Sequence, residues 1–359
     1  MNGTGMVGTF HKIRWGSIVS FLVMALSVLT GSSSVSRAQA SSGALLAYEP
    51  FGKTGKTPFA LNGASGGGDQ GWASAWVEQS GSKAVPGYNV ASALALTYTG
   101  LLTTPDYATG GFGYQSAGRT LDVSAEGPFA SYVSNGLIHA PGQSIWISFL
   151  LRQDANGATP VVGLTAQAGD TAWSTNPANI QIGYFGPSSN DAGGIPRWSL
   201  QYSGSTVTTN VAVVKGQTVL FVVEDTFGSN GVGDQINLYV SPTSLGGSAP
   251  AAPNLQYTPS GSTAFQSITF YGGSSSDQSS LGDIRVGTSY SAVTPKPAVP
   301  SIPIGLAATA GIVVLVLIIV GGVIARRRAT KYANNKKKRK VVWGEIVVDE
   351  ATASATCRT

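Results

Sequence analysis

Apolar and polar side chains alternate along several segments in the middle of the chain. Between Ser144 and Arg152, one face of an extended strand carries Ile145, Ile147, Phe149 and Leu151. Because successive side chains of a strand point to opposite faces, this period of two predicts a strand whose apolar face is turned to a core. The same alternation predicts strands that carry Ile180, Ile182 and Tyr184; Trp198, Leu200 and Tyr202; Ile236, Leu238 and Val240; and Ile268 with Phe270.

Other segments complete the expected strand set. Residues 218–223 are apolar on both faces, which indicates a strand covered on both sides. The remaining expected strands are residues 72–79, 93–98, 129–134, 160–166 and 283–290. Turn-forming residues separate the strands at 156–157, 187–194, 228–233 and 272–280. About twelve short strands spaced in this way predict an all-β fold, a two-sheet antiparallel sandwich.

The pattern changes after the sandwich. Residues 294–303 hold four prolines, which predict a stiff, extended stalk. Ile304 to Ala325 is an uncharged, apolar run, long enough as a helix of roughly 33 Å to cross a hydrocarbon core of about 30 Å. Nine of the fifteen residues from Arg326 to Lys340 are basic. The positive-inside rule therefore predicts one transmembrane helix at 304–325, a cytoplasmic tail at 326–359 and everything before the span outside the cell membrane.

The N-terminal end agrees with export. Lys12 and Arg14 precede a short apolar stretch, and Ala38-Gln39-Ala40 is a small-x-small cleavage pattern. Residues 1–40 are therefore predicted to be a removed signal peptide, with an uncleaved anchor as the alternative. Residues 41–293 form the expected ectodomain.

The distribution of charge limits the kinds of binding partner, and the cysteine content limits how the ectodomain is stabilised. Residues 41–303 hold nine lysines and arginines against fourteen acidic residues, whereas residues 326–359 hold ten against three. The basic block lies beside the predicted membrane span and contains almost no aromatic residues, so we expect it to contact anionic inner-leaflet lipids and no nucleic acid. The single cysteine, Cys357, lies in the tail, so a hydrophobic core and not a disulfide framework must stabilise the ectodomain.

Five segments carry a family resemblance: Tyr48-Glu49-Pro50-Phe51, Gly71-Trp72-x-x-x-Trp76, residues 144–152, residues 234–242 and residues 282–290. Together they resemble bacterial exported surface domains of the concanavalin A-like, or laminin G-like, jelly-roll class. The resemblance covers roughly Leu45 to Pro295 and implies a jelly-roll sandwich. The class includes lectins, adhesion modules and glycoside hydrolases, and the fold alone does not choose among them.

The resemblance also implies a structural calcium ion, although no cofactor is required. In related carbohydrate-binding modules a Glu of the opening strand and an Asp of the closing strand help to bind calcium, and Glu49 and Asp283 occupy comparable places. Hard carboxylate oxygens suit that ion. The alternatives are that Asp283 forms an ion pair with Arg285 or Arg119, or that it simply faces water.

Catalytic signals are weak. The chain lacks the Glu-x-Asp-x-x-Glu run of the class's glucanases, and the adjacent Glu224 and Asp225 point to opposite faces if their strand continues. The one ectodomain histidine, His139, precedes Pro141-Gly142 and is interpreted as an exposed turn residue. We therefore expect a non-enzymatic protein.

Exposed aromatic rings are the remaining candidates for function, because sugar rings stack on them. Trp173 and Trp198 flank the polar loop 187–194, in which Asn190 and Asp191 can bond sugar hydroxyls. The alternative is that both tryptophans are core residues, the role assigned to Trp72, Trp76 and Trp146. The leading hypothesis is a membrane-anchored cell-surface module that binds glycan or contributes to adhesion. A glycoside hydrolase with carboxylates far apart in sequence and a purely structural envelope protein are the alternatives.

Overall fold

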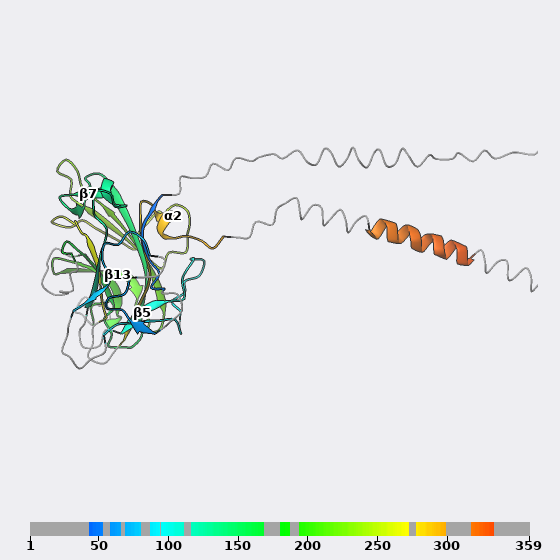
Figure 1. The fold of residues 1–359 in the computed structure, drawn as a ribbon, viewed down its shortest axis with the longest axis horizontal. Coiled ribbons are helices and arrows are strands. Elements are labelled where there is room, and N and C mark those ends of the chain that lie inside the picture. Colours follow the sequence, from blue (N-terminus) through cyan, green and yellow to red (C-terminus); the bar gives the residue numbers. More distant parts are fainter. Residues whose placement is uncertain are drawn as a thin grey trace, which may run out of the picture. The chain divides into compact units, whose positions relative to one another are not determined.

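Antiparallel strands dominate the computed structural model (Figure 1). The structure describes residues 43–52, 58–65, 69–79, 87–93, 95–110, 116–168, 180–186, 194–272, 278–298 and 317–333. The chain divides into two units, Met1–Pro297 and Ala298–Thr359. The predicted signal peptide, residues 304–316 of the predicted span and residues 334–359 of the tail lie outside the described residues.

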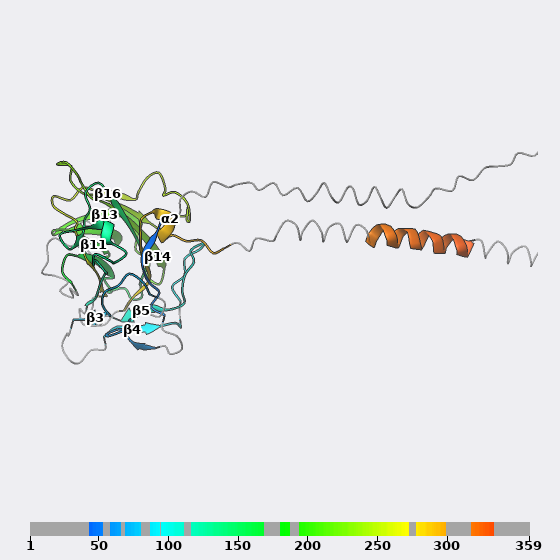
Figure 2. The ribbon, with the colours of Figure 1, turned by 45° about the horizontal axis from the view of Figure 1, so that its top comes forward.

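Two sheets build the first unit (Figure 2). The first sheet has nine strands, with β1 (Leu45–Glu49) paired to β18 beside the path β16 (Leu255–Tyr257), β15 (Gln235–Val240), β14 (Thr218–Thr226), β9 (Ser144–Gln153), β18 (Ser279–Gly287), β5 (Tyr107–Gly110), β4 (Asn89–Ala91) and β2 (Phe59–Ala60). The second sheet runs β13 (Ser205–Ala212), β12 (Arg197–Tyr202), β11 (Ile180–Gly183), β10 (Val161–Thr165), β17 (Ser267–Tyr271), β6 (Ser116–Thr120) and β3 (Val77–Glu78). The strand pairs of both sheets are antiparallel.

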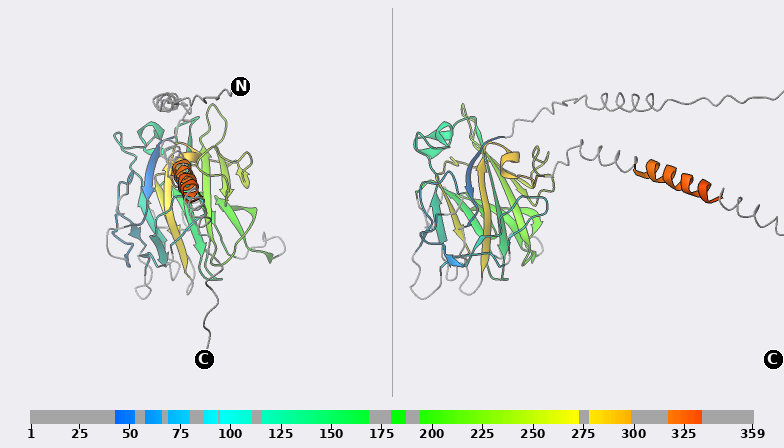
Figure 3. Two further views of the ribbon diagram at one scale, coloured as in Figure 1. Left: turned by 90° about the vertical axis from the view of Figure 1, so that its right-hand side faces the viewer. Right: turned by 45° about the vertical axis from the view of Figure 1, so that its right-hand side comes forward.

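Smaller elements complete this unit. The hairpin β7 (Val133–Ser134) and β8 (Leu137–Ile138) follows the short helix η1 (Ala130–Tyr132), and α2 (Tyr290–Val293) follows β18. Strand β1 lies beside β18, so the first and last strands of the unit are neighbours (Figure 3). The all-β, two-sheet antiparallel sandwich predicted from the sequence is confirmed.

The main core lies between the sheets. It contains the predicted inward face of β9, namely Ile145, Ile147, Phe149 and Leu151. Alternate residues of β15, β12 and β17 meet it there, as their period of two predicted, and so do Val219, Phe221 and Val223 of β14.

A second apolar cluster covers part of the outer face of the first sheet. Trp146 and Leu150 of β9 pack there with Leu220 and Val222 of β14. Residues from the segment 95–106, the segment after β15 and α2 lie over them. This cover is the physical reason that β14 is apolar on both faces.

Several predicted element bounds were wrong. The described residues of 93–98 form no strand, and Leu96 instead packs on the outer face of the first sheet. Residues 129–134 contain η1 and only the first two-residue strand of a hairpin. Within 72–79 only Val77–Glu78 is a strand. Strand β18 begins at Ser279 and ends at Gly287, so it starts and finishes earlier than predicted.

In the second unit, residues 317–333 are helical. They include the last nine residues of the predicted span and the arginines that follow it. Among the residues that the structure describes, no helix combines the length and the apolar character needed to cross a membrane.

Candidate functional site

The predicted sugar-binding residues do not form a site in the described structure. Trp173, Asn190 and Asp191 lie outside the described residues. Trp198 lies in β12 with 0% exposure and makes an edge contact with the ring of Phe221 at 5.1 Å between centroids. A fully buried indole offers no face to a ligand, so the prediction that Trp198 lines a binding face was wrong.

Glu49, one of the two predicted calcium ligands, is fully buried between the sheets. Its carboxylate forms an ion pair with Arg119 of β6. It also accepts hydrogen bonds from the indole N–H of Trp76 at 2.9 Å and from the backbone N–H of Phe51 at 2.7 Å. Burial raises the pKa of Glu49, and the nearby Arg119 charge and the hydrogen bonds oppose that rise.

Asp283, the other predicted ligand, lies at an irregularity in the pairing of β18 with β9 and has a φ of +48°. Its carboxylate accepts hydrogen bonds from the Tyr48 hydroxyl at 2.9 Å, from the Thr104 backbone N–H at 3.0 Å and from Arg285 Nη2 at 3.0 Å. Burial raises the pKa of Asp283, and the Arg285 charge opposes the rise. The ion pair between Asp283 and Arg285 is one of the alternatives that the sequence left open.

These two carboxylates do not converge on one point. Glu49 lies opposite Ile284 in the β1–β18 register and faces the core, whereas Tyr48, which bonds Asp283, lies opposite Arg285 on the other face. Both carboxylates are already surrounded by N–H and O–H donors, which leave little room for a cation. Among the described residues no group of three or more histidine, cysteine, aspartate or glutamate side chains is placed to hold a metal ion. A structural calcium ion stays a prediction, and Glu49 and Asp283 as placed do not fit a shared one.

His139 is more enclosed than the sequence predicted. Its side chain is 24% exposed, packs against the ring of Phe227, and places Nε2 3.0 Å from Asp234 Oδ2. The prediction of an exposed turn residue was wrong, because the carboxylate of Asp234 and the ring of Phe227 enclose the imidazole.

Glu224 and Asp225 point to opposite faces of β14, as predicted. Asp225 is fully buried and bonds Thr263, whereas Glu224 accepts a hydrogen bond from the Asn237 side chain. Two carboxylates on opposite faces of one sheet cannot act on the same sugar.

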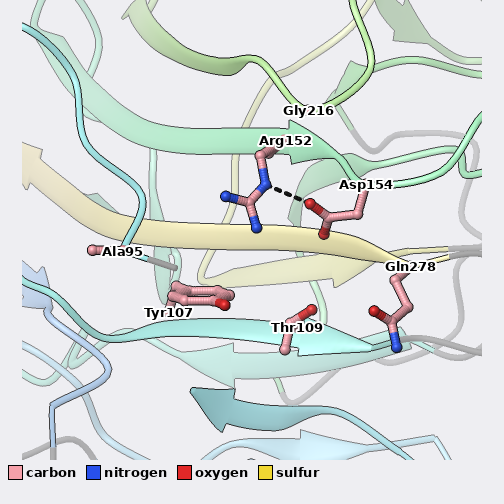
Figure 4. A pocket seen from close by; sticks show the side chains of 7 residues that line it. All are labelled: Ala95, Tyr107, Thr109, Arg152, Asp154, Gly216 and Gln278. Carbon is pink, nitrogen blue, oxygen red and sulfur yellow. Dashed lines mark hydrogen bonds and ion pairs between the residues drawn. The ribbon is translucent and has the colours of Figure 1, made fainter. Parts of the chain in front are cut away.

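A pocket opens on the outer face of the first sheet, and we call it the Arg152 pocket (Figure 4). Its volume is about 590 Å³, within the range of about 300–1,000 Å³ that is usual for small-molecule sites. The residues that line it are Ala95, Tyr107, Thr109, Arg152, Asp154, Gly216 and Gln278. Arg152 lies in β9 and Tyr107 and Thr109 in β5, and the others lie in segments next to β5, β9, β14 and β18.

Cross-strand register brings the polar side chains together. Arg152 of β9 lies opposite Ser280 of β18, and Ser280 lies opposite Thr109 of β5. Side chains directly opposite each other on neighbouring strands share a face, so all three project outward at the same level of the sheet. Strand pairing therefore sets the floor of the pocket, and the connecting segments that carry Ala95, Asp154, Gly216 and Gln278 complete its lining.

An ion pair occupies one wall of the pocket. Arg152 Nε donates to Asp154 Oδ1, and the guanidinium lies over the Tyr107 ring, with Cζ 5.6 Å from the ring centroid. The Ser280 hydroxyl donates to Asp154 Oδ2 at 2.6 Å. Arg152 Nη2 donates to the same hydroxyl at 3.4 Å. A cation, a carboxylate and hydroxyls are thus fixed around one hollow, an arrangement that can both donate to and accept from a hydroxyl-rich ligand.

The sequence contained one signal for this pocket that our sequence reasoning missed. On the outward face of β9, Trp146 and Leu150 pack in the second apolar cluster, and the Ser148 hydroxyl donates to the Val293 carbonyl. Arg152 ends this face. A charged residue at the end of an otherwise apolar outward face indicates that the segments covering the sheet stop there.

Among the described residues that line the Arg152 pocket, Asp154 is the one acid. Glu224, on the same face, lies opposite Trp146, six residues along β9 from Arg152 and therefore roughly 20 Å away along the strand. Hydrolysis of a glycosidic bond needs its two carboxyl groups about 5–9.5 Å apart.

Comparisons with known proteins give no family for this chain. No family model matches the sequence, and no curated protein matches it significantly.

Solved structures with related architecture were found. The globular domain of T. cruzi calreticulin is 8% identical, covers 59% of this chain and 84% of its own, and has a TM-score of 0.37. An endo-β-1,4-glucuronan lyase from the fungus Trichoderma reesei is 11% identical, with coverages of 64% and 95% and a TM-score of 0.30. The exoplasmic/lumenal domain of VIP36 in a Ca²⁺/Man3GlcNAc-bound form is 11% identical, with coverages of 63% and 89% and a TM-score of 0.30. Scores this low carry no argument about what this chain binds.

Proposed function

We propose that this protein is a non-enzymatic carbohydrate-binding module displayed on the cell surface. The observation that carries the proposal is the Arg152 pocket, where a guanidinium, a carboxylate, hydroxyls and the Gln278 amide surround one hollow. Sugars present closely spaced hydroxyls that both donate and accept, and such a set of fixed polar groups suits them. Asp154 is the one acid among the described lining residues, which supports binding over hydrolysis.

The position of the module belongs to the same proposal. The apolar run Ile304 to Ala325 and the basic block Arg326 to Lys340 support a single membrane span with the sandwich outside and the tail in the cytoplasm. The span holds the module at the cell membrane, and the proline-rich residues 294–303 lift it off the surface. Adhesion through surface glycans is the role that this arrangement serves.

A pocket-filling variant tests the proposal. Ala95 lines the Arg152 pocket, so Ala95→Phe places a ring in the hollow. The purified full-length chain, kept in a non-glycosidic detergent, is applied to a glycan array. We expect wild type to bind a subset of glycans and Ala95→Phe to lose that binding at least about tenfold, while its melting temperature stays near that of wild type.

The matched control is Ala125→Phe, which adds the same ring at an exposed position after β6 and is expected to bind like wild type. Two results would contradict the proposal: no binding to any glycan by the folded wild-type chain, or undiminished binding by Ala95→Phe.

A further inference from the structure

The Arg152 pocket presents a cation and an anion side by side. Among the described residues that line it, Arg152 and Asp154 carry charge, and they form an ion pair with each other. The side chains of this pair are 12% and 17% exposed, so solvent screens their charges less than it would at an open surface.

The pair is fixed by its neighbours. The Ser280 hydroxyl, fully buried, contacts both partners, at 2.6 Å from Asp154 Oδ2 and 3.4 Å from Arg152 Nη2. It also lies 3.2 Å from Thr109 Oγ1. The Tyr107 ring supports the guanidinium from below, as Figure 4 shows. A ligand therefore meets a preformed pair and cannot recruit the arginine without pulling it from Asp154.

This arrangement separates ligands by charge. A uronic acid or sulfated sugar that approaches Arg152 also approaches the carboxylate of Asp154, and the repulsion offsets the attraction. A neutral sugar carries no charge that Asp154 can repel. One of its hydroxyls can accept a hydrogen bond from the guanidinium, and the same or a neighbouring hydroxyl can donate one to the carboxylate. Resting on the proposed function, we infer that the Arg152 pocket selects neutral saccharides and uses Asp154 to exclude acidic ones.

The test compares a neutral oligosaccharide with its uronic-acid counterpart of the same linkage, for example mannohexaose with hexamannuronate. Binding to the full-length chain is measured by titration calorimetry for wild type and Asp154→Asn. We expect wild type to prefer the neutral member at least tenfold. The nearly isosteric Asp154→Asn removes the carboxylate that repels an acidic ligand beside Arg152, so we expect it to lose most of that preference and to gain affinity for the acidic member.

A control variant and a second measurement on the wild-type chain complete the test. Glu126→Gln removes an exposed carboxylate outside the pocket and is expected to leave the preference unchanged. If Asp154→Asn does not fold, wild type still decides the question, since its preference for the neutral member should shrink when ionic strength rises from about 0.05 to 0.5 M and salt screens the repulsion. An unchanged preference would contradict the inference.

The outcomes separate the two proposals. Equal or stronger binding of uronates by wild type, or an unchanged preference in folded Asp154→Asn, would overturn the selectivity inference and leave glycan binding standing. Failure of wild type to bind any saccharide would overturn the proposed function as well.

Discussion

Two buried carboxylates share a single hydroxyl at one end of the sandwich. Thr263 Oγ1 lies 2.9 Å from Asp225 Oδ1 and 2.9 Å from Asp234 Oδ2. A hydroxyl has one proton, so one of these contacts needs a proton from a carboxyl group. Burial alone raises the pKa of Asp234, but hydrogen bonds from the N–H groups of Thr263 and Gly228 and the charge of His139 outweigh it and lower the pKa. Asp225 is the group that keeps its proton.

Burial, as the largest cause, raises the pKa of Asp225 well above its usual value, and Oδ2 of Asp225 has no hydrogen-bond partner among the described residues. The folded state therefore retains a proton that the unfolded state releases near pH 3.9. Because the folded state then binds more protons, this residue makes stability fall as pH rises above about 4, up to the folded-state pKa.

Asp225→Asn tests this sign. The variant removes a term of up to about 1.4 kcal/mol per pH unit, so its free energy of unfolding relative to wild type should grow as pH rises from about 4. The measurement is denaturant unfolding of both chains across about pH 4 to 8. A difference between the two chains that stays constant with pH would show that Asp225 is ionised in the folded state.

Asp234 has the opposite effect on the pH dependence of stability. Its lowered folded-state pKa contributes stability that is present above about pH 3.9 and is lost as pH falls through the folded-state value. Asp234→Asn should therefore destabilise the protein at neutral pH, and the loss should shrink in acid. A loss of equal size at both ends of the same pH series would contradict the assignment.

Trp198 gives a prediction about the core. Its indole is fully buried against Phe221, so Trp198→Ala should lower the free energy of unfolding by roughly 3–5 kcal/mol through the cavity it leaves. Glycan affinity, corrected for the folded fraction, should not change. A selective loss of binding without a melting shift would restore Trp198 to a binding face.

At the scale of elements, the pairing of β1 with β18 closes the first sheet, and a buried ion pair marks the junction. Arg285 is 3% exposed and contacts Asp283, the Leu102 carbonyl at 2.6 Å and the ring of Tyr48. Asp283 has the positive φ that aspartate and asparagine tolerate better than most residues. Asp283 therefore has two roles: it occupies the positive-φ position in the backbone, and its carboxylate neutralises the charge of Arg285.

Asp283→Asn separates these roles, because asparagine keeps the backbone preference and removes the charge. Leaving Arg285 buried without its partner should cost about 3 kcal/mol or more. The double variant Asp283→Asn with Arg285→Met should recover much of that loss, since no buried charge is left. Thermal melts of the three chains check this, and a double variant no more stable than the single one would contradict it. Chelator added to wild type tests the calcium prediction separately, because a bound ion would make the melting temperature fall.

The sequence predicted the strands that place alternate apolar side chains in the main core, such as β9, β12 and β15, because this alternation reports the buried face directly. It missed β5, β6 and β13, which are rich in Gly, Ala, Ser and Thr and owe their place to neighbouring strands. It also misread 93–98, where Leu96 is apolar because it covers a sheet. The Arg152 pocket escaped prediction because its residues are far apart in the sequence and meet through the register of β9, β18 and β5 and through the segments next to these strands.

At the scale of the whole molecule, the proposed arrangement is a sandwich outside the cell, a span and a basic tail inside. The block Arg326 to Lys340 cannot cheaply cross a bilayer. Protease applied to intact cells should therefore remove the sandwich and spare a tag placed after Thr359. Permeabilised cells are the control, in which the tag should be lost, and loss of the tag from intact cells would contradict the orientation.

One measurement tests surface display and glycan binding together. Intact cells that express the full-length chain are assayed for their capture of fluorescent polysaccharides. Cells with wild type and with Ala95→Phe are matched for surface level by an antibody to the sandwich and compared by flow cytometry. The account predicts that wild-type cells capture at least one neutral polysaccharide and that Ala95→Phe cells capture it no better than cells without the protein. Equal capture by both, or no capture by wild-type cells, would contradict a surface module that binds glycan through the Arg152 pocket.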